Sequence, residues 1–389
     1  MTLKPSQIQA ILDAKREDFQ SFNKKALNHL EKYRAALDQL STWPLEKIQK
    51  KLRRCSGECG AIALEPLEHH ENCVIASRFD WGNREQSLAW VRQKLMNITT
   101  FAVDGSQIFP GKDLSLPVAL VQIGWFENPH LEVGTYEKDI EVDVMTPSDL
   151  QVSSSGEPAD RRVNFRRFEM EINRLVRYIE EHKNQQDCLV FFDGSLVGTF
   201  ADAFDGDLRR QYVDCFLKLL NASQTYQVPL VGFVDTTYAR DLTVMLQHLF
   251  QLPECPAIHD AQLLHTFMEW GDRTPIFQCD RSGILKEYGE QHNQIAFTYL
   301  KTTRHSFPAR VEMPMWLYQS GLANRVMDWV RGEVIIGGGY PYVIETADQT
   351  AVLQSMDRQA FFKLLQDWAE KEDIKLRLSR KMVSKTRRR

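Results

Sequence analysis

The segments FAVDGSQ at 101–107 and FFDGSLVG at 191–198 share one local pattern, in which Asp-Gly-Ser follows a short apolar run. Each apolar run predicts a buried strand, and Asp104 and Asp193 are expected where their strands end, because the next glycine lets the chain turn sharply. In open α/β sheets, ligand sites lie outside the carboxyl ends of the strands. If the two strands are neighbours, both aspartates point into one crevice.

A pair of carboxylates in one crevice favours metal chemistry. A single Asp-Gly after a strand is common turn chemistry, but its repetition favours a functional pair. Neighbouring carboxylates repel one another, which raises one pKa, and a divalent cation removes that repulsion. Oxygen-rich sites suit Mg²⁺ and Mn²⁺, which activate water for phosphodiester hydrolysis. The pattern therefore indicates a divalent-cation site.

A third acidic ligand is expected on the amphipathic helix predicted at about 161–182. Glu169 and Glu171 are the candidates. Two residues apart on a helix corresponds to a rotation of about 200°, so only one of them faces the site. Periodicity alone leaves this choice open.

The order of predicted elements defines the fold class. Strands are expected at 99–103, 117–126, 131–144, 188–192 and 229–234. Helices are expected at 161–182, 208–225, 238–250, 322–331 and 358–370. A strand meander followed by alternating helices and strands predicts an α/β protein of the RNase H-like class, with a mixed five-stranded sheet flanked by helices.

Four segments are expected along the chain. They are an N-terminal helical arm with its connector at 1–97, the first part of the core at 98–250, an α+β insertion with a hairpin at 251–320, and a C-terminal part at 321–389 that completes the core and ends in a basic tail. The arm is predicted to be helical over 5–52, and 53–80 irregular. The Gly-rich stretch GGGYP at 337–341 is expected to form a turn, and it lacks the lysine of a phosphate-binding P-loop.

Composition limits the class of protein. Hydrophobic residues make up 43% and charged residues 26% of the chain, and the formal net charge is -4. The tail from Lys371 to Arg389 is basic and is either a DNA contact or a solvated, frayed terminus. No run is long and apolar enough for a membrane span, and residues 1–20 do not resemble a secretory signal. The seven scattered cysteines favour reduced thiols and a cytoplasmic location.

Several further residues keep two interpretations open. Asp235 follows a predicted strand and is either part of the acidic cluster or the N-cap of the next helix. Asp260 is similarly ambiguous. Arg310 either contacts phosphate or forms a surface salt bridge with Glu312. The ligand types at Cys55, Cys59, His69, His70 and Cys73 allow a structural zinc, although their spacing lacks the usual paired form.

Five segments together resemble the NurA nuclease family. They are FAVDGSQ at 101–107, RRFEMEINRL at 166–175, FFDGSLVG at 191–198, RVEMP at 310–314 and GYPYVIETADQTAVL at 339–353. Their order matches the family's order. The resemblance implies an RNase H-like fold, a ring-shaped homodimer and a Mn²⁺-dependent nuclease (or Mg²⁺-dependent). It also implies 5′-to-3′ degradation of DNA ends, cleavage of single strands, and a HerA-type hexameric translocase as partner in DNA end resection.

The resemblance also assigns site residues. Asp104 and Asp193 match the family's metal-binding aspartates, and Glu171 matches its helical glutamate, with Glu169 as the alternate. Tyr340 matches the tyrosine of the C-terminal motif. Typical members continue to an Ala-His pair, whereas this chain has Asp348 after Ala347.

Asp348 is therefore a departure from the family's pattern. Because Asp also binds hard cations, the change either preserves metal binding with another metal preference or weakens catalysis. The alternative function is a catalytically degenerate NurA-like module that binds DNA or a translocase without cutting. A third hypothesis is that the chain is a different RNase H-like enzyme, such as a Piwi-type or Holliday-junction nuclease.

Overall fold

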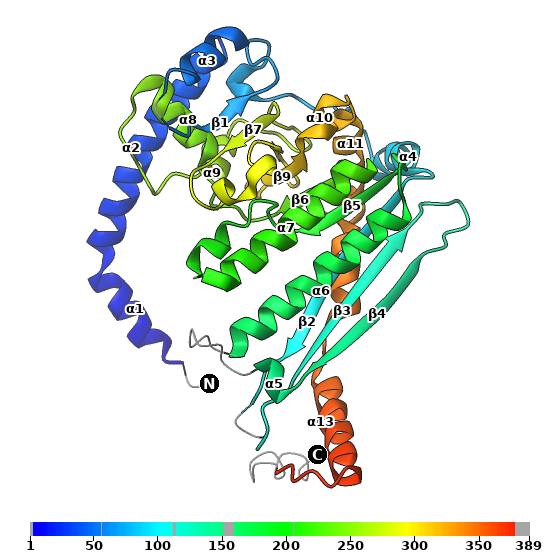
Figure 1. The fold of residues 1–389 in the computed structure, drawn as a ribbon. Coiled ribbons are helices and arrows are strands. Elements are labelled where there is room, and N and C mark those ends of the chain that lie inside the picture. Colours follow the sequence, from blue (N-terminus) through cyan, green and yellow to red (C-terminus); the bar gives the residue numbers. More distant parts are fainter. Residues whose placement is uncertain (1–2, 56, 112–113, 151–158, 205, 378–389) are drawn as a thin grey trace. The chain divides into compact units, whose positions relative to one another are not determined.

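A computed structural model describes residues 3–55, 57–111, 114–150, 159–204 and 206–377 (Figure 1). The predicted basic tail from 378 onward lies outside these residues. The chain divides into two compact units. The first comprises Met1–Asp80, Val234–Ser282 and Asn293–Met315, and the second comprises Trp81–Phe233, Gly283–His292 and Trp316–Arg389. Within the described ranges, no helix is long and apolar enough to cross a membrane.

The first unit combines helices with antiparallel strands. Its helices are α1 (Pro5–Ala14), α2 (Arg16–Leu40), α3 (Leu45–Leu52), η1 (Glu71–Cys73), α8 (Asp241–Phe250) and α9 (Asp260–Leu264). Its strands pair in the order β1 (Gly60–Ala63), β7 (Phe277–Asp280), β8 (Ile295–Leu300) and β9 (Ala309–Pro314). The hairpin predicted within the insertion is confirmed as β8–β9. The prediction of an irregular 53–80 segment is wrong where β1 pairs with β7.

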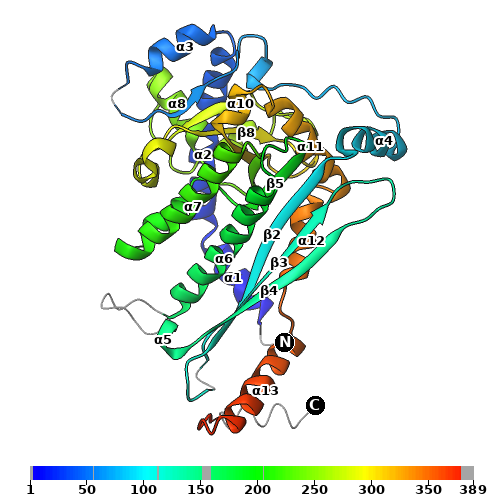
Figure 2. The ribbon, with the colours of Figure 1, turned by 45° about the vertical axis from the view of Figure 1, so that its right-hand side comes forward.

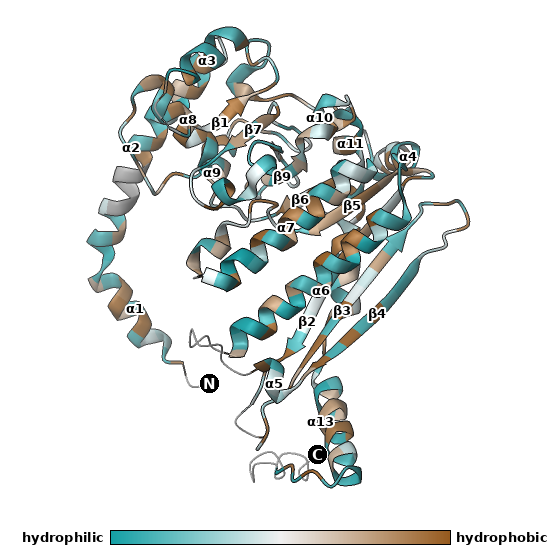
Figure 3. Cartoon of the chain, in the orientation of Figure 1, coloured by the Kyte–Doolittle hydropathy of each residue, from teal (hydrophilic) through white to brown (hydrophobic). Residues whose placement is uncertain are grey.

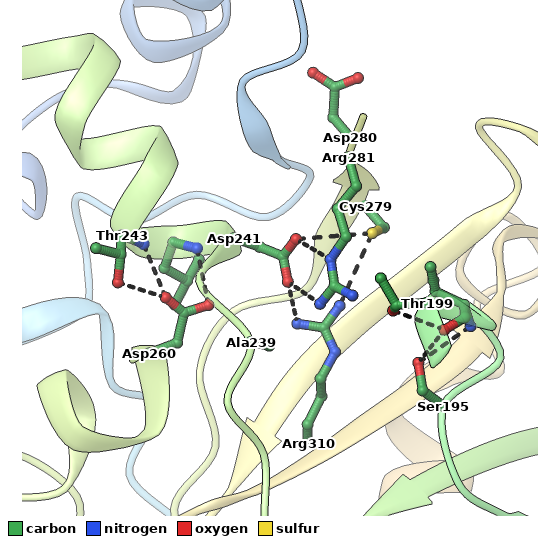
Figure 4. Close-up of polar contacts among 12 residues, drawn as sticks. Ser195, Thr199, Ala239, Asp241, Thr243, Asp260, Cys279, Asp280, Arg281 and Arg310 are labelled. Carbon is green, nitrogen blue, oxygen red and sulfur yellow. Dashed lines mark hydrogen bonds and ion pairs between the residues drawn. The ribbon is translucent and has the colours of Figure 1, made fainter. Parts of the chain in front are cut away.

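A buried cluster of ion pairs lies in the core of the first unit. Arg310 and Arg281 both donate to Asp241 at 2.6 Å (Figure 4). Arg310 also donates to Glu312 at 2.6 Å. The side chains of Arg310, Asp241 and Glu312 are all 1% exposed or less. The interpretation of Arg310 and Glu312 as a surface salt bridge is therefore wrong, because the pair is fully buried and shares a third partner.

The second unit contains a mixed sheet with the strand order β6-β5-β2-β3-β4. Its strands are β2 (Thr99–Ile108), β3 (Ala119–Asn128), β4 (Glu137–Met145), β5 (Cys188–Asp193) and β6 (Leu230–Val234). β2 runs parallel to β5 and β5 parallel to β6, whereas β2, β3 and β4 form a long antiparallel meander (Figure 2). The mixed α/β fold with flanking helices and the meander are as predicted. Among the described residues there are nine strands rather than five, and the other four belong to the first unit.

The second unit also contains helices. They are α4 (Arg84–Leu95), α5 (Pro147–Leu150), α6 (Ala159–Glu181), η2 (Thr199–Ala203), α7 (Gly206–Tyr226), η3 (Ile284–Gln291), α10 (Met315–Gln319), α11 (Ala323–Ile336), α12 (Tyr342–Ala351) and α13 (Ser355–Lys371). Helix α6 packs against β2 and β3 through an apolar stripe, and its outer turns are hydrophilic (Figure 3). Helix α12 also packs against β2 and β3.

The α12 helix follows the predicted turn at 337–341 and lies where the sequence analysis predicted no element. The glycines do form a turn, since Gly338 and Gly339 have positive φ values of 68° and 127°. After Pro341 the chain becomes helical again, with Val343, Ile344, Ala347 and Ala351 buried. The family-like segment at 339–353 therefore forms a turn followed by a helix on the sheet.

Candidate active site

Asp104 and Asp193 lie on adjacent parallel strands. The ladder between β2 and β5 pairs Ala102 with Phe191, so continuing the same register aligns Asp104 with Asp193. Asp193 is the last residue of β5, and Gly194 turns the chain with a φ of 142°. The expectation that Asp104 ends its strand is wrong, because β2 continues to Ile108 while pairing with β3.

Asp348 joins these aspartates from α12. Its carboxyl acts on Asp104, whose pKa it raises through side-chain hydrogen bonding and through its charge. One turn later, the Ala351 carbonyl accepts hydrogen bonds from the Ser106 hydroxyl and the Gln122 amide. A Cβ on Gly124, which pairs with Asp104, would lie 2.6 Å from the Ala351 nitrogen. The absence of a side chain at Gly124 therefore allows the close approach that brings Asp348 to Asp104.

Tyr340 is held beside Asp193. Its hydroxyl donates a 2.7 Å hydrogen bond to Asp193 Oδ1. Its ring packs edge-on against Phe233, the β6 residue that pairs with Asp193. The turn before α12 thus orients one carboxylate of the cluster.

Glu171 approaches β2 from the α6 side. A Cβ on Gly105 would overlap Glu171 Oε1 and would lie 2.7 Å from Arg167 Cγ. Because side chains alternate along a strand, Gly105 faces α6, whereas Asp104 and Ser106 face α12. Glu171 therefore lies on the opposite face of β2 from the aspartates. It is next to Gly105, which has no side chain. The sequence pattern suggested a turn at Gly105, and the structure shows a close packing position instead.

The two helical glutamates have different surroundings. Glu171 is 7% exposed and accepts a 2.6 Å hydrogen bond from Arg167. Glu169 pairs with Arg166, which also binds Asp143 on β4. The charges of Asp104 and Asp193 both act on Glu171.

The acids influence one another's protonation. Burial raises the pKa of Asp104 to about 6, and the hydrogen bond to Asp348 and the charges of Asp193 and Asp348 act in the same direction. Burial raises the pKa of Glu171 to about 8; Arg167 opposes this shift, while the charges of Asp104 and Asp193 add to it. Such raised values are expected where carboxylates share a site with too little positive charge.

This donor set fits a hard divalent cation in chemistry. Four carboxylates offer only oxygen ligands, and a cation would replace the protons that the raised pKa values favour. The positions of these side chains fit a bound cation less well than their chemistry does. Within the described ranges, no group of three or more His, Cys, Asp or Glu side chains is arranged to hold a metal ion. The acids are thus neighbours, but they do not form a complete coordination shell for a metal ion. One carboxylate oxygen of Glu171 is hydrogen-bonded to Arg167.

The remaining candidates lie in the first unit. Asp260 is fully buried and accepts hydrogen bonds from the Leu242 and Thr243 amides and from two hydroxyls. The interpretation of Asp235 as a helix N-cap is wrong, because α8 begins at Asp241. The five Cys and His residues weighed for zinc form no metal-binding group among the described residues.

A comparison with protein-family models shows which family this chain belongs to. The model of the NurA domain matches residues 98–353, which include every acid of the site. The chain belongs to the NurA family. No curated protein matches this NurA chain.

Solved structures show remote similarity. A crystal structure of NurA has 10% identity and a TM-score of 0.42, covering 72% of this chain and 95% of that chain. A crystal structure of NurA bound to dAMP and manganese has 9% identity and a TM-score of 0.39, covering 66% and 85%. The catalytic domain of human endonuclease V has 14% identity and a TM-score of 0.33, covering 75% and 91%.

Proposed function

We propose that this NurA-family chain is a metal-dependent deoxyribonuclease that hydrolyses DNA phosphodiesters with Mn²⁺ or Mg²⁺. The main support is the meeting of Asp104, Asp193 and Asp348 on one face of the sheet, with raised carboxylate pKa values. Glu171 contributes from the other face at Gly105. Family membership supports the nuclease role, and the dAMP and manganese held by a related crystal structure suggest the ligand classes.

The chain's own residues have separate roles in this proposal. Asp104, Asp193 and Asp348 would hold the cation, and Glu171 would reach it past Gly105, where β2 has no side chain. The cation would supply an activated water and stabilise the leaving oxygen. Tyr340 acts as a positioning residue, because its hydroxyl fixes the Asp193 carboxylate. Cation binding displaces protons from Asp104 and Glu171, so the affinity for the cation should rise with pH.

The proposed type of DNA cleavage is inferred from membership of the NurA family. We propose 5′-to-3′ exonuclease and single-strand endonuclease action in double-strand break end resection. The proposed assembly is a cytoplasmic homodimer working with a HerA-type hexameric translocase.

Cleavage of end-labelled single-stranded DNA with Mn²⁺ tests the proposed function. Asp104→Asn and Asp193→Asn should abolish cutting while leaving the urea unfolding midpoint close to that of the wild type. Glu169→Gln is the matched control, because Glu169 pairs with Arg166 on the same helix, and it should retain activity. A well-folded Asp104→Asn protein that still cuts with Mn²⁺ would remove the assignment.

Substitutions of Asp348 distinguish an active nuclease from a degenerate module that only binds DNA. If the wild type binds single strands but does not cut them, and Asp348→His cuts, the aspartate has disabled catalysis. If the wild type cuts and Asp348→Ala does not, Asp348 works as a ligand.

A further inference from the structure

The loop that follows Asp193 is rigidly built and carries an exposed aromatic ring. The Ser195 and Thr199 hydroxyls both donate to the Val197 carbonyl (Figure 4). The Tyr288 hydroxyl accepts from the Gly198 amide and donates to the Leu196 carbonyl, at 3.0 Å each. These contacts fix the backbone between the site and η2.

Phe200 lies at the start of η2, seven residues after Asp193. It is 49% exposed, yet its ring is edge-on to Tyr212, Phe168 and Phe216 at 5.1 to 6.1 Å. Part of the ring is thus fixed by packing, and the remainder faces solvent. The ion pair between Arg209 and Asp202 holds the other end of η2.

The aromatic surface continues away from Phe200 and gains a positive charge. Phe204 stacks on Tyr212 with an interplanar angle of 14°. The Arg161 guanidinium lies over the Phe204 ring, 5.4 Å from its centroid. Aromatic rings next to a cation are the surface that binds unpaired bases and their phosphates.

This surface is connected to the site through α6. Phe168, which touches Phe200, is three residues before Glu171, so the two side chains are neighbours along the helix. Arg161 is ten residues before Glu171, about 15 Å along the axis at 1.5 Å per residue. The rings and Arg161 therefore extend outward from Glu171 over the length of a few nucleotides.

We propose that Phe200, Phe204 and Arg161 form a platform for a DNA strand entering the site, in which Phe200 stacks an unpaired base and Arg161, held over Phe204, binds a phosphate. The inference rests on the proposed nuclease function and specifies its substrate as a single-stranded end. A single exposed phenylalanine is ordinary on a protein surface. Phe200 differs because hydrogen bonds fix its loop. Its aromatic neighbours lead to Phe204, which lies under the Arg161 guanidinium. Its chain segment also begins at Asp193, a proposed metal ligand.

Binding in EDTA tests the platform independently of cutting. The probe is a short oligothymidylate with one 2-aminopurine, whose fluorescence falls when the base stacks. Phe200→Leu keeps the apolar packing but removes the aromatic face, and Phe200→Tyr keeps the face. We expect Phe200→Leu to lose the quenching and to weaken binding on the order of 10-fold, while Phe200→Tyr retains both. Phe307→Ala, at a 52% exposed ring of the first unit, is the matched control.

Two further measurements make the test specific. Arg161→Gln should lower the slope of log affinity against log salt by about 0.7, the value for one phosphate on a single strand. With Mn²⁺, Phe200→Leu should raise KM with kcat within about twofold, because stacking acts on binding. If Phe200→Leu binds and quenches like the wild type, the platform is wrong. If the wild type cuts no DNA, the nuclease proposal fails, and the binding result stands separately.

Discussion

Glu171 allows a quantitative test of the site's electrostatics. The residue is 7% exposed, and the pKa of its carboxyl is raised from 4.5 to about 8, chiefly by burial. Between these two values the unfolded chain has released the proton and the folded chain still holds it. Raising the pH therefore favours the unfolded state, and the free energy of unfolding should fall by about 1.4 kcal/mol per pH unit from this residue alone.

Replacing the carboxyl by an amide should remove that dependence. Glu171→Gln keeps the size and the contact with Arg167 but does not titrate. From pH 5 to pH 7 in EDTA, we expect the wild type to lose about 3 kcal/mol more than Glu171→Gln. The loss attributable to Asp104, whose pKa is about 6, occurs in both proteins and cancels in the comparison.

Urea unfolding at pH 5, 6 and 7 provides the measurement. Glu169→Gln is again the control and should follow the wild type. Equal pH slopes in the wild type and Glu171→Gln would refute the assignment of a buried, protonated Glu171. Saturating Mn²⁺ at pH 7 should restore stability to the wild type more than to Glu171→Gln, since the cation replaces the proton only where a carboxylate is present.

Three further substitutions test other contacts. Tyr340→Phe loses the hydrogen bond to Asp193 and should lower kcat about 10-fold with less than about 1.5 kcal/mol change in unfolding free energy; unchanged cleavage would mean that the hydroxyl has no positioning role. Gly124→Ala places a methyl against the α12 backbone and should cost about 1–3 kcal/mol in urea unfolding, so a neutral result would contradict the close contact. Arg310→Met removes a cation from a buried ion cluster and should destabilise the protein by about 3–5 kcal/mol; a stability equal to that of the wild type would show that the cluster does not depend on this cation.

The sequence predicted the core of the second unit because its signals are local. The apolar runs that end near Asp104 and Asp193 are strong enough to identify β2 and β5, and the amphipathic period identifies α6. The end of β2 was misplaced because strand pairing is not local: β2 continues past the Asp-Gly-Ser sequence since β3 provides hydrogen-bond partners up to Ile108.

The arrangement of side chains around the acids required the tertiary structure. Periodicity could not decide between Glu169 and Glu171, because the choice depends on which side of α6 meets β2. The role of Gly105 was also hidden: a glycine after an aspartate suggests a turn, whereas here it leaves room for Glu171. The α12 helix was missed because its ten residues follow a Gly-Pro stretch that itself predicts a break.

The attachment of α12 to β2 affects the order in which the protein can become active during synthesis. Ser106 and Ala351, which join the two elements, are 245 residues apart in the chain. A ribosome therefore makes Asp104 and Asp193 well before it makes the helix that carries Asp348. A nascent chain holds an incomplete acidic centre until translation has passed α12, so any cleavage that needs Asp348 is delayed until the domain is almost fully made.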